Sequence, residues 1–144
     1  NVTSSFYKRG KIDFDNLQGE QKYSYFGAYA NSKLANVIFT YELAKRLLGS
    51  GVAVNCLNPG PIRTVSSSAT PFEKFIITNF GWIFLKKPEV GGRIVVYLAT
   101  SPDVEGITGK YLEKNYKFTP TTKASYDKGV AKELWEVSKQ LASQ

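Results

Sequence analysis

The sequence contains no histidine. Histidine is the commonest general base and the commonest transition-metal ligand in proteins, so its absence excludes Ser-His-Asp and Cys-His nucleophile systems. A single cysteine, Cys56, can form neither an intrachain disulfide nor a CxxC metal or redox motif. Proton transfer must therefore rely on Tyr, Lys, Asp or Glu side chains, and this cysteine usage is typical of an intracellular protein.

Long apolar runs are also missing. No stretch approaches the roughly 18 consecutive apolar residues of a membrane-spanning helix. The first residues lack the charged start and apolar run of a secretory signal, and the chain opens on Asn1 instead of Met. We expect one domain, whose start was processed away or which is a piece of something longer, since 144 residues suffice for a single core.

Positive charge is in excess, with a net charge of +7. The lysines and arginines occur in ones and twos, without a basic run or a nucleic-acid-binding motif, which favours a solvated basic surface. Binding of a cofactor phosphate would account for part of the excess. A nucleic-acid binder is kept as an alternative that rests on charge alone.

A long amphipathic helix is predicted from Gly27 onward. Apolar residues recur there at spacings of three and four until Gly49 and Gly51 supply stop signals. A short β-branched strand follows at 52–58 and stops at a PGP turn, so these elements form the αβ half of a βαβ unit. The predicted apolar face of the helix consists of Leu34, Val37, Ile38, Tyr41, Ala44 and Leu48.

Helices and strands alternate along the whole chain. This alternation predicts an α/β fold, with a parallel sheet and helices on its faces. About three strands are visible where such sheets usually have about five or six, so we expect the second half of a domain without its first half. The other predicted segments are a strand end at 1–5, a partly helical stretch at 64–87, a helix at 88–101, a strand at 106–114 and a terminal helix at 126–142.

Tyr29 and Lys33 stand four residues apart on the predicted helix and therefore project from the same face. An ammonium beside a phenol stabilises the phenolate and lowers the phenol pKa from its usual value near ~10. Tyr29 is therefore a candidate general acid or base. Tyrosine and lysine also occur at this spacing by chance on ordinary helices, so the pair alone does not decide the function.

Two further features lie where ligands of open α/β sheets bind, beyond the carboxyl ends of strands. Ser4 ends the first predicted strand, where its hydroxyl can donate a hydrogen bond to the substrate oxygen that Tyr29 would protonate. The NPGPIRT turn at 58–64 ends the next strand. Together with the tyrosine and lysine, these features favour an enzyme over an ordinary helix.

These motifs resemble those of the short-chain dehydrogenase/reductase family. The stretches GKIDFDNLQGEQKYS, AYANSKLANVIFTYELAKRL and LWEVSKQL are similar to its retinol dehydrogenase-like branch, many members of which carry HPG where this chain has NPG. The family's YxxxK motif matches Tyr29 and Lys33, its strand-end serine matches Ser4, and its PGxxxT motif matches Pro59, Gly60 and Thr64.

The resemblance covers essentially the whole chain, but only the carboxyl-terminal half of the family's domain. It implies a Rossmann-like, doubly wound parallel sheet of which residues 1–144 form the carboxyl-terminal half. The family's TGxxxGxG phosphate loop, NNAG segment and catalytic asparagine are not in this sequence. We therefore expect the isolated chain to bind cofactor weakly or not at all and to be inactive.

The resemblance implies interconversion of a carbonyl and an alcohol with NADP or NAD, with NADP favoured. Tyr29 would exchange a proton with the substrate oxygen, and Ser4 would polarise that oxygen. Lys33 would depress the tyrosine pKa and hold the nicotinamide ribose. A homodimer is also implied, because the matching helix of relatives often packs against its twofold mate. The implied cofactor-binding residues are Tyr29, Lys33, Pro59, Gly60, Ile62 and Thr64.

The apolar segment 65–87 corresponds to the variable substrate lid of the family. It implies an elongated apolar substrate such as a retinoid, and with its lysines it would also suit contact with a membrane surface. Packing against the missing half is an alternative, and association with the endoplasmic reticulum or another membrane would come from an upstream anchor. The main alternative to an enzyme is a truncated, non-catalytic interaction module that retains the fold.

Overall fold

The computed structural model describes residues 1–62 and 85–143. Helices and strands alternate along these residues, as the sequence pattern predicts. A short 3₁₀ helix, η1 (Ser5–Arg9), precedes the first long helix. The principal elements are α1 (Tyr25–Arg46), β1 (Cys56–Leu57), α3 (Pro88–Thr100), β2 (Tyr111–Leu112) and α4 (Lys128–Ala142).

Three parallel stretches of chain form the middle layer. β1 pairs with β2 in the register Cys56 to Tyr111 and Leu57 to Leu112. On the other side of β1, Val2 forms a parallel bridge with Leu57. β1 is therefore central, and the carboxyl ends of all three stretches reach the same edge of the layer.

The regular part of β1 is shorter than the predicted strand at 52–58. Before Cys56 the pairing is mixed: the Gly109 N–H donates to the Val54 carbonyl at 2.8 Å, while the Val54 N–H donates to Thr108 Oγ1 at 3.0 Å and the Lys110 N–H to Asn55 Oδ1 at 2.9 Å. These bonds satisfy the backbone without extending the strand ladder. The segments that contain β1 and β2 thus run side by side over a longer distance than the ladder itself.

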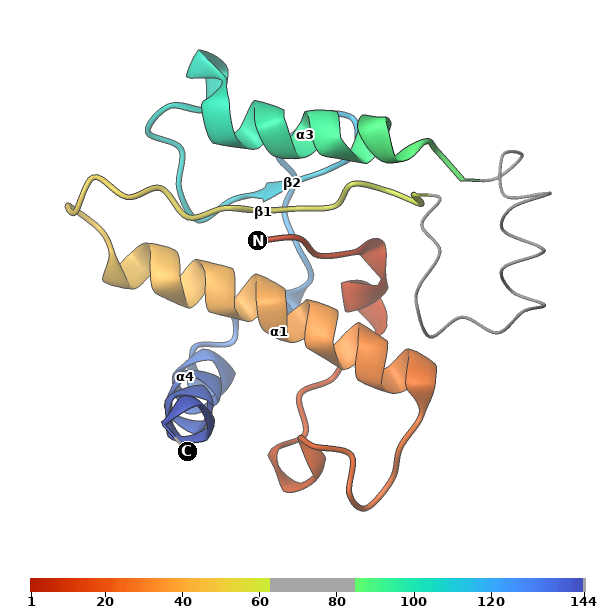
Figure 1. Ribbon diagram of the computed structural model, residues 1–144. Helices are drawn as coiled ribbons and strands as arrows, with labels where there is room; N and C mark the ends of the chain where they lie inside the picture. The colour runs from red at the N-terminus through yellow and green to blue at the C-terminus, as the bar shows by residue number, and fades with distance from the viewer. Residues whose placement is uncertain (63–84, 144) are drawn as a thin grey trace.

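Helices cover both faces of this layer, with α3 on one side and α1 with α4 on the other (Figure 1). Neighbouring strand residues point to opposite faces, so each strand contributes to two cores. Cys56 and Tyr111 pack in the cluster that contains Leu34 of α1 and Leu134 of α4. Leu57 and Leu112 pack against Ile94 of α3. This is the doubly wound arrangement of a Rossmann-like α/β fold, present here in part.

α1 follows the predicted apolar periodicity over most of its length. Ser24 caps its first turn by accepting a hydrogen bond from the Gly27 N–H at 3.4 Å, so the helix begins two residues before Gly27. Leu34, Val37, Ile38 and Ala44 are buried as predicted. Leu48 is 70% exposed, and its predicted burial is wrong because the helix ends at Arg46, before the apolar spacing does.

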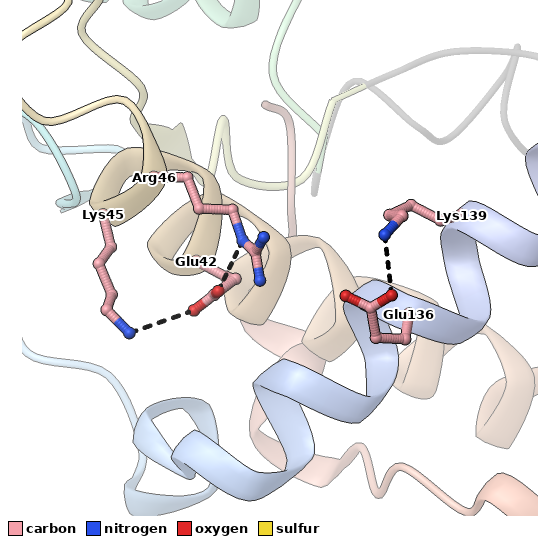
Figure 2. A network of polar contacts seen from close by, with 5 residues as sticks. All are labelled: Glu42, Lys45, Arg46, Glu136 and Lys139. Carbon is pink, nitrogen blue, oxygen red and sulfur yellow. Dashed lines mark hydrogen bonds and ion pairs between the residues drawn. The ribbon is translucent and has the colours of Figure 1, made fainter.

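Ion pairs lie on the surface of the helices α1 and α4 (Figure 2). Glu42 accepts from Arg46 Nε at 2.7 Å and lies 4.0 Å from Lys45 Nζ, and the guanidinium of Arg46 also stacks 4.2 Å from the Trp135 ring centroid. The Lys45 and Arg46 side chains are 71% and 38% exposed, and ion pairs at the protein surface contribute about 0–1 kcal/mol, so the apolar clusters dominate the stability. The stacked guanidinium nevertheless joins the two helices at this end.

The predicted partial helix at 64–87 and its substrate lid lie almost wholly outside the described residues. Within residues 1–62 and 85–143, no helix combines the length and apolar character that crossing a bilayer requires.

Candidate active site

A cavity of about 790 Å³ opens at the carboxyl edge of the three parallel stretches. Its position agrees with the general placement of ligand sites in open α/β sheets. The cavity is lined by all but one of the predicted site residues: Ser4, Tyr29, Lys33, Pro59, Gly60 and Ile62. The other predicted site residue, Thr64, lies outside the described residues.

Ser4 lies where the first parallel stretch ends and η1 begins. Its backbone is extended, and its Oγ accepts a hydrogen bond from the Phe6 N–H at 3.4 Å. A serine hydroxyl keeps its own proton when it accepts a bond, so Ser4 can still donate to a ligand in the cavity. The neighbouring Thr3 is buried and donates through Oγ1 to the Lys33 carbonyl at 3.0 Å, which joins this stretch to α1.

Tyr29 and Lys33 lie one turn apart on α1, on the face that lines the cavity. The Lys33 Nζ lies 5.4 Å from the centroid of the Tyr29 ring. Phe6 of η1 packs edge-on against the same ring, with 5.7 Å between the centroids. Tyr29 is 39% exposed, so its ring is supported on one side while the side chain remains accessible.

The turn after β1 forms another part of the cavity wall. Gly60 has a φ of +81°, a left-handed conformation that glycine adopts without strain. Ile62 packs closely on α3: a Cβ placed on Gly91 would lie 3.0 Å from Cδ1 of Ile62, so the Ile62 side chain would have to shift to admit one. The Lys86 N–H donates to the Pro61 carbonyl at 2.9 Å and fixes the far end of the turn.

Comparison with known proteins identifies the family. The family model described as enoyl-(acyl carrier protein) reductase matches residues 12–115. Retinol dehydrogenase 14 of Homo sapiens is 40% identical over 145 residues, which cover 97% of this chain and 42% of that protein. Retinol dehydrogenase 13 of Mus musculus is 38% identical, with 98% and 44% covered. The chain belongs to the short-chain dehydrogenase/reductase family.

Within the short-chain dehydrogenase/reductase family, these relatives place the chain in the retinol dehydrogenase-like branch. Polyprenol dehydrogenase of Homo sapiens is also similar, at 34% identity over 97% of this chain and 43% of that protein. A crystal structure of an uncharacterized protein from Mycobacterium Paratuberculosis shares the fold with a TM-score of 0.67 and 26% identity, covering 99% of this chain and 49% of that one. The chain thus spans less than half the length of each relative.

Several residues that line the cavity were not predicted as site residues from the sequence, among them Asn58, Glu113 and Lys114. Glu113 and Lys114 directly follow β2, so the rule that ligands bind beyond the carboxyl ends of strands would have found them.

A close approach between η1 and α1 fixes the distance between Ser4 and Tyr29. A Cβ placed on Gly10 would lie 2.5 Å from the Ala30 carbonyl oxygen and 2.8 Å from Leu34 Cβ. The next residue is tied down as well, because the Lys11 N–H donates to Asn31 Oδ1 at 2.8 Å. Ser4 and Tyr29 are therefore carried by two elements that are in direct backbone contact.

Cys56 is buried in the core, as predicted from its place in an apolar strand. Burial raises the pKa of its thiol to about 11. The thiol is therefore protonated near neutral pH, a state in which it is a poor nucleophile.

Proposed function

We propose that this chain carries the proton-transfer site of an NAD(P)-dependent oxidoreductase that interconverts a carbonyl and an alcohol on an apolar, lipid-like substrate. The observation that supports this most strongly is the gathering of Ser4, Tyr29 and Lys33 around one cavity. A hydroxyl donor, a phenol and an ammonium suffice for acid–base catalysis at an oxygen atom without histidine. The names of the retinol and polyprenol dehydrogenases favour the same reaction class.

Each side chain has one proposed role. In the reductive direction, Tyr29 gives its proton to the substrate oxygen while the carbonyl carbon gains a hydride, and in oxidation both transfers reverse. Ser4 donates a hydrogen bond to the same oxygen and stabilises the negative charge that develops there. The Lys33 ammonium, 5.4 Å from the Tyr29 ring centroid, stabilises the charge that the phenol gains when it loses its proton.

The cavity also suits the nicotinamide end of a dinucleotide. Its volume of about 790 Å³ lies within the usual range for ligand pockets, about 300–1,000 Å³, and its hydroxyl and ammonium groups suit ribose hydroxyls. NADP or NAD supplies or accepts the hydride when bound, and the resemblance to the family favours NADP. The ribose would be held by Tyr29 and Lys33, and the carboxamide side of the ring by Pro59, Gly60, Ile62 and, from the sequence motif, Thr64.

A row of exposed aromatic rings supports the apolar substrate. Tyr29 packs against Phe6, whose ring centroid lies 6.4 Å from that of Phe26, and Tyr25 continues the row at 5.5 Å from Phe26. Phe26 is 67% exposed. An apolar chain that starts at the reacting carbonyl would lie along this row and remove the rings from water.

Replacing Phe26 by Ser is expected to raise the KM for a long apolar aldehyde about fivefold, because partial burial of a Phe side chain contributes about 1 kcal/mol. The KM for propanal should stay unchanged. Steady-state kinetics with retinaldehyde and propanal measure this difference. Phe39→Ser is the matched control, because Phe39 lies on the same helix but stacks on Trp135. Equal KM values for retinaldehyde in the Phe26→Ser variant and the unmodified protein would contradict the proposal that the apolar substrate lies along this row of rings.

The direct test of the function uses the full-length protein that carries this sequence. We expect it to reduce retinaldehyde with NADPH or NADH, followed by the loss of reduced-nicotinamide absorbance. We also propose that residues 1–144 act as the carboxyl-terminal part of a single domain, so the isolated chain should show no turnover. A folded full-length protein that binds neither cofactor would contradict the proposed oxidoreductase activity and favour a non-catalytic interaction module. Turnover by the isolated chain would contradict only the proposal that residues 1–144 are part of a larger domain.

A further inference from the structure

Asn58 is a buried polar residue at the carboxyl end of the central strand, with 6% of its surface exposed. Its backbone N–H continues the ladder by donating to the Leu112 carbonyl at 2.9 Å. Both ends of its side-chain amide are also used. Oδ1 accepts from the Gly60 N–H at 3.0 Å, and Nδ2 donates to Glu113 Oε2 at 3.0 Å. The amide therefore bridges the turn after β1 and the turn after β2.

Both of these turns line the cavity that contains Tyr29. Gly60 lies at the point where the first turn reverses, with its φ of +81°. The Lys114 stem from the second turn covers Gly60, since a Cβ placed there would lie 3.1 Å from Lys114 Cδ. The two turns are thus in contact, and the Asn58 side chain is the buried polar link between them.

We infer that Asn58 is a positioning residue for the site: by bridging the Gly60 N–H and the Glu113 carboxylate, it holds the turn at 59–62 in the shape that binds the cofactor. This inference rests on the proposed function, because it assigns the turn to the cofactor. Neither an alkyl side chain nor a carboxylate reproduces the link, since the site needs one acceptor toward Gly60 and one donor toward Glu113.

The test measures the dissociation constant for NADPH of the full-length protein by titration of the cofactor fluorescence. Asn58→Ala should weaken binding by about threefold to tenfold, the loss expected when a preorganising hydrogen bond is removed. The KM for cofactor should rise by the same factor, while kcat at saturating cofactor stays within about twofold, because Tyr29 and Ser4 lie on other elements.

Glu113 provides a rescue experiment. Glu113→Gln keeps an oxygen that accepts from Asn58 Nδ2, so it should retain most of the cofactor affinity that Glu113→Ala loses. Glu113→Ala removes the acceptor and should weaken binding as Asn58→Ala does. Weakening by Glu113→Gln as large as that by Glu113→Ala would show that the charge of Glu113 matters instead of the bridge, and would overturn the inference.

Asn55 offers a matched control at the other end of the same strand. Its Oδ1 accepts from the Lys110 N–H at 2.9 Å and its Nδ2 donates to the Ile107 carbonyl at 2.6 Å, so it bridges the same two segments away from the cavity. Asn55→Ala should lower the melting temperature as much as Asn58→Ala does, and leave cofactor affinity unchanged. An equal loss of cofactor affinity in both variants would show that Asn58 acts only through the stability of the fold, and would overturn the inference.

A second readout needs no cofactor. Amide hydrogen exchange of Gly60 in the free protein should accelerate in Asn58→Ala, because its N–H loses its acceptor. Unchanged exchange would overturn the inference whether or not cofactor binds. If the unmodified protein fails to bind NADPH and NADH, the proposed function fails, whereas normal binding by Asn58→Ala overturns only the inference.

Discussion

Replacing Tyr29 by Phe in the full-length protein is expected to lower kcat/KM by about 10²–10⁴-fold, the usual contribution of a general acid or base. The variant keeps the ring that packs edge-on against Phe6 and loses only the hydroxyl. Cofactor affinity should fall by no more than the loss of one hydrogen bond, about tenfold at most. Stopped-flow reduction of an apolar aldehyde and a fluorescence titration of NADPH measure the two quantities.

Tyr23→Phe is the matched control for this loss. Tyr23 precedes α1, is 66% exposed, and lines a different hollow from Tyr29. Removing its hydroxyl should leave kcat/KM unchanged. A Tyr29→Phe enzyme that keeps more than about a tenth of the activity would show that another group transfers the proton.

Replacing Gly10 by Ala is expected to destabilise the protein by about 1–3 kcal/mol, the usual cost of overpacking a tight contact. The added Cβ would lie 2.5 Å from the Ala30 carbonyl oxygen, and a helical backbone cannot move aside cheaply. The backbone of Gly10 is not itself special, because its φ of −73° suits any residue. Denaturant unfolding of the full-length protein, followed by circular dichroism, gives the change in free energy of unfolding.

Gly92→Ala separates this contact from the general effect of removing a glycine. Gly92 lies inside α3, and a Cβ placed there meets nothing within 4 Å. Alanine should therefore stabilise α3 by about 0.5–1 kcal/mol through its helix propensity. If Gly10→Ala were as stable as the unmodified protein, the close packing of η1 on α1 would not be what sets the spacing between Ser4 and Tyr29.

The elements of the fold were largely predictable because their signals are local. The apolar spacing of α1 identifies Leu34, Val37 and Ile38 as core residues, and all three are buried. Leu48 was predicted wrongly because it continues the spacing beyond the point where the helix ends. The extent of the ladder was not predictable, since it ends where the Asn55 side chain replaces backbone pairing, a contact with residues far along the chain.

The candidate site was likewise predictable in part, where its signals are local. Ser4, Tyr29 and Lys33 were recognisable by residue type and spacing, and the parallel order of strands brings their elements to one edge. The bridge from Asn58 to Glu113 was not recognisable, because it depends on the register of β1 against β2. Two-residue strands carry no periodic pattern from which a register can be derived.

The most direct test of the account is a double-mutant cycle on kcat/KM with Ser4→Ala, Tyr29→Phe and the double variant. If the serine and the tyrosine act on one substrate oxygen, their effects are not independent, and the double variant should be no more than about threefold slower than Tyr29→Phe alone. A double variant whose loss equals the product of the two single losses would show that the two side chains act separately, contrary to the proposed site.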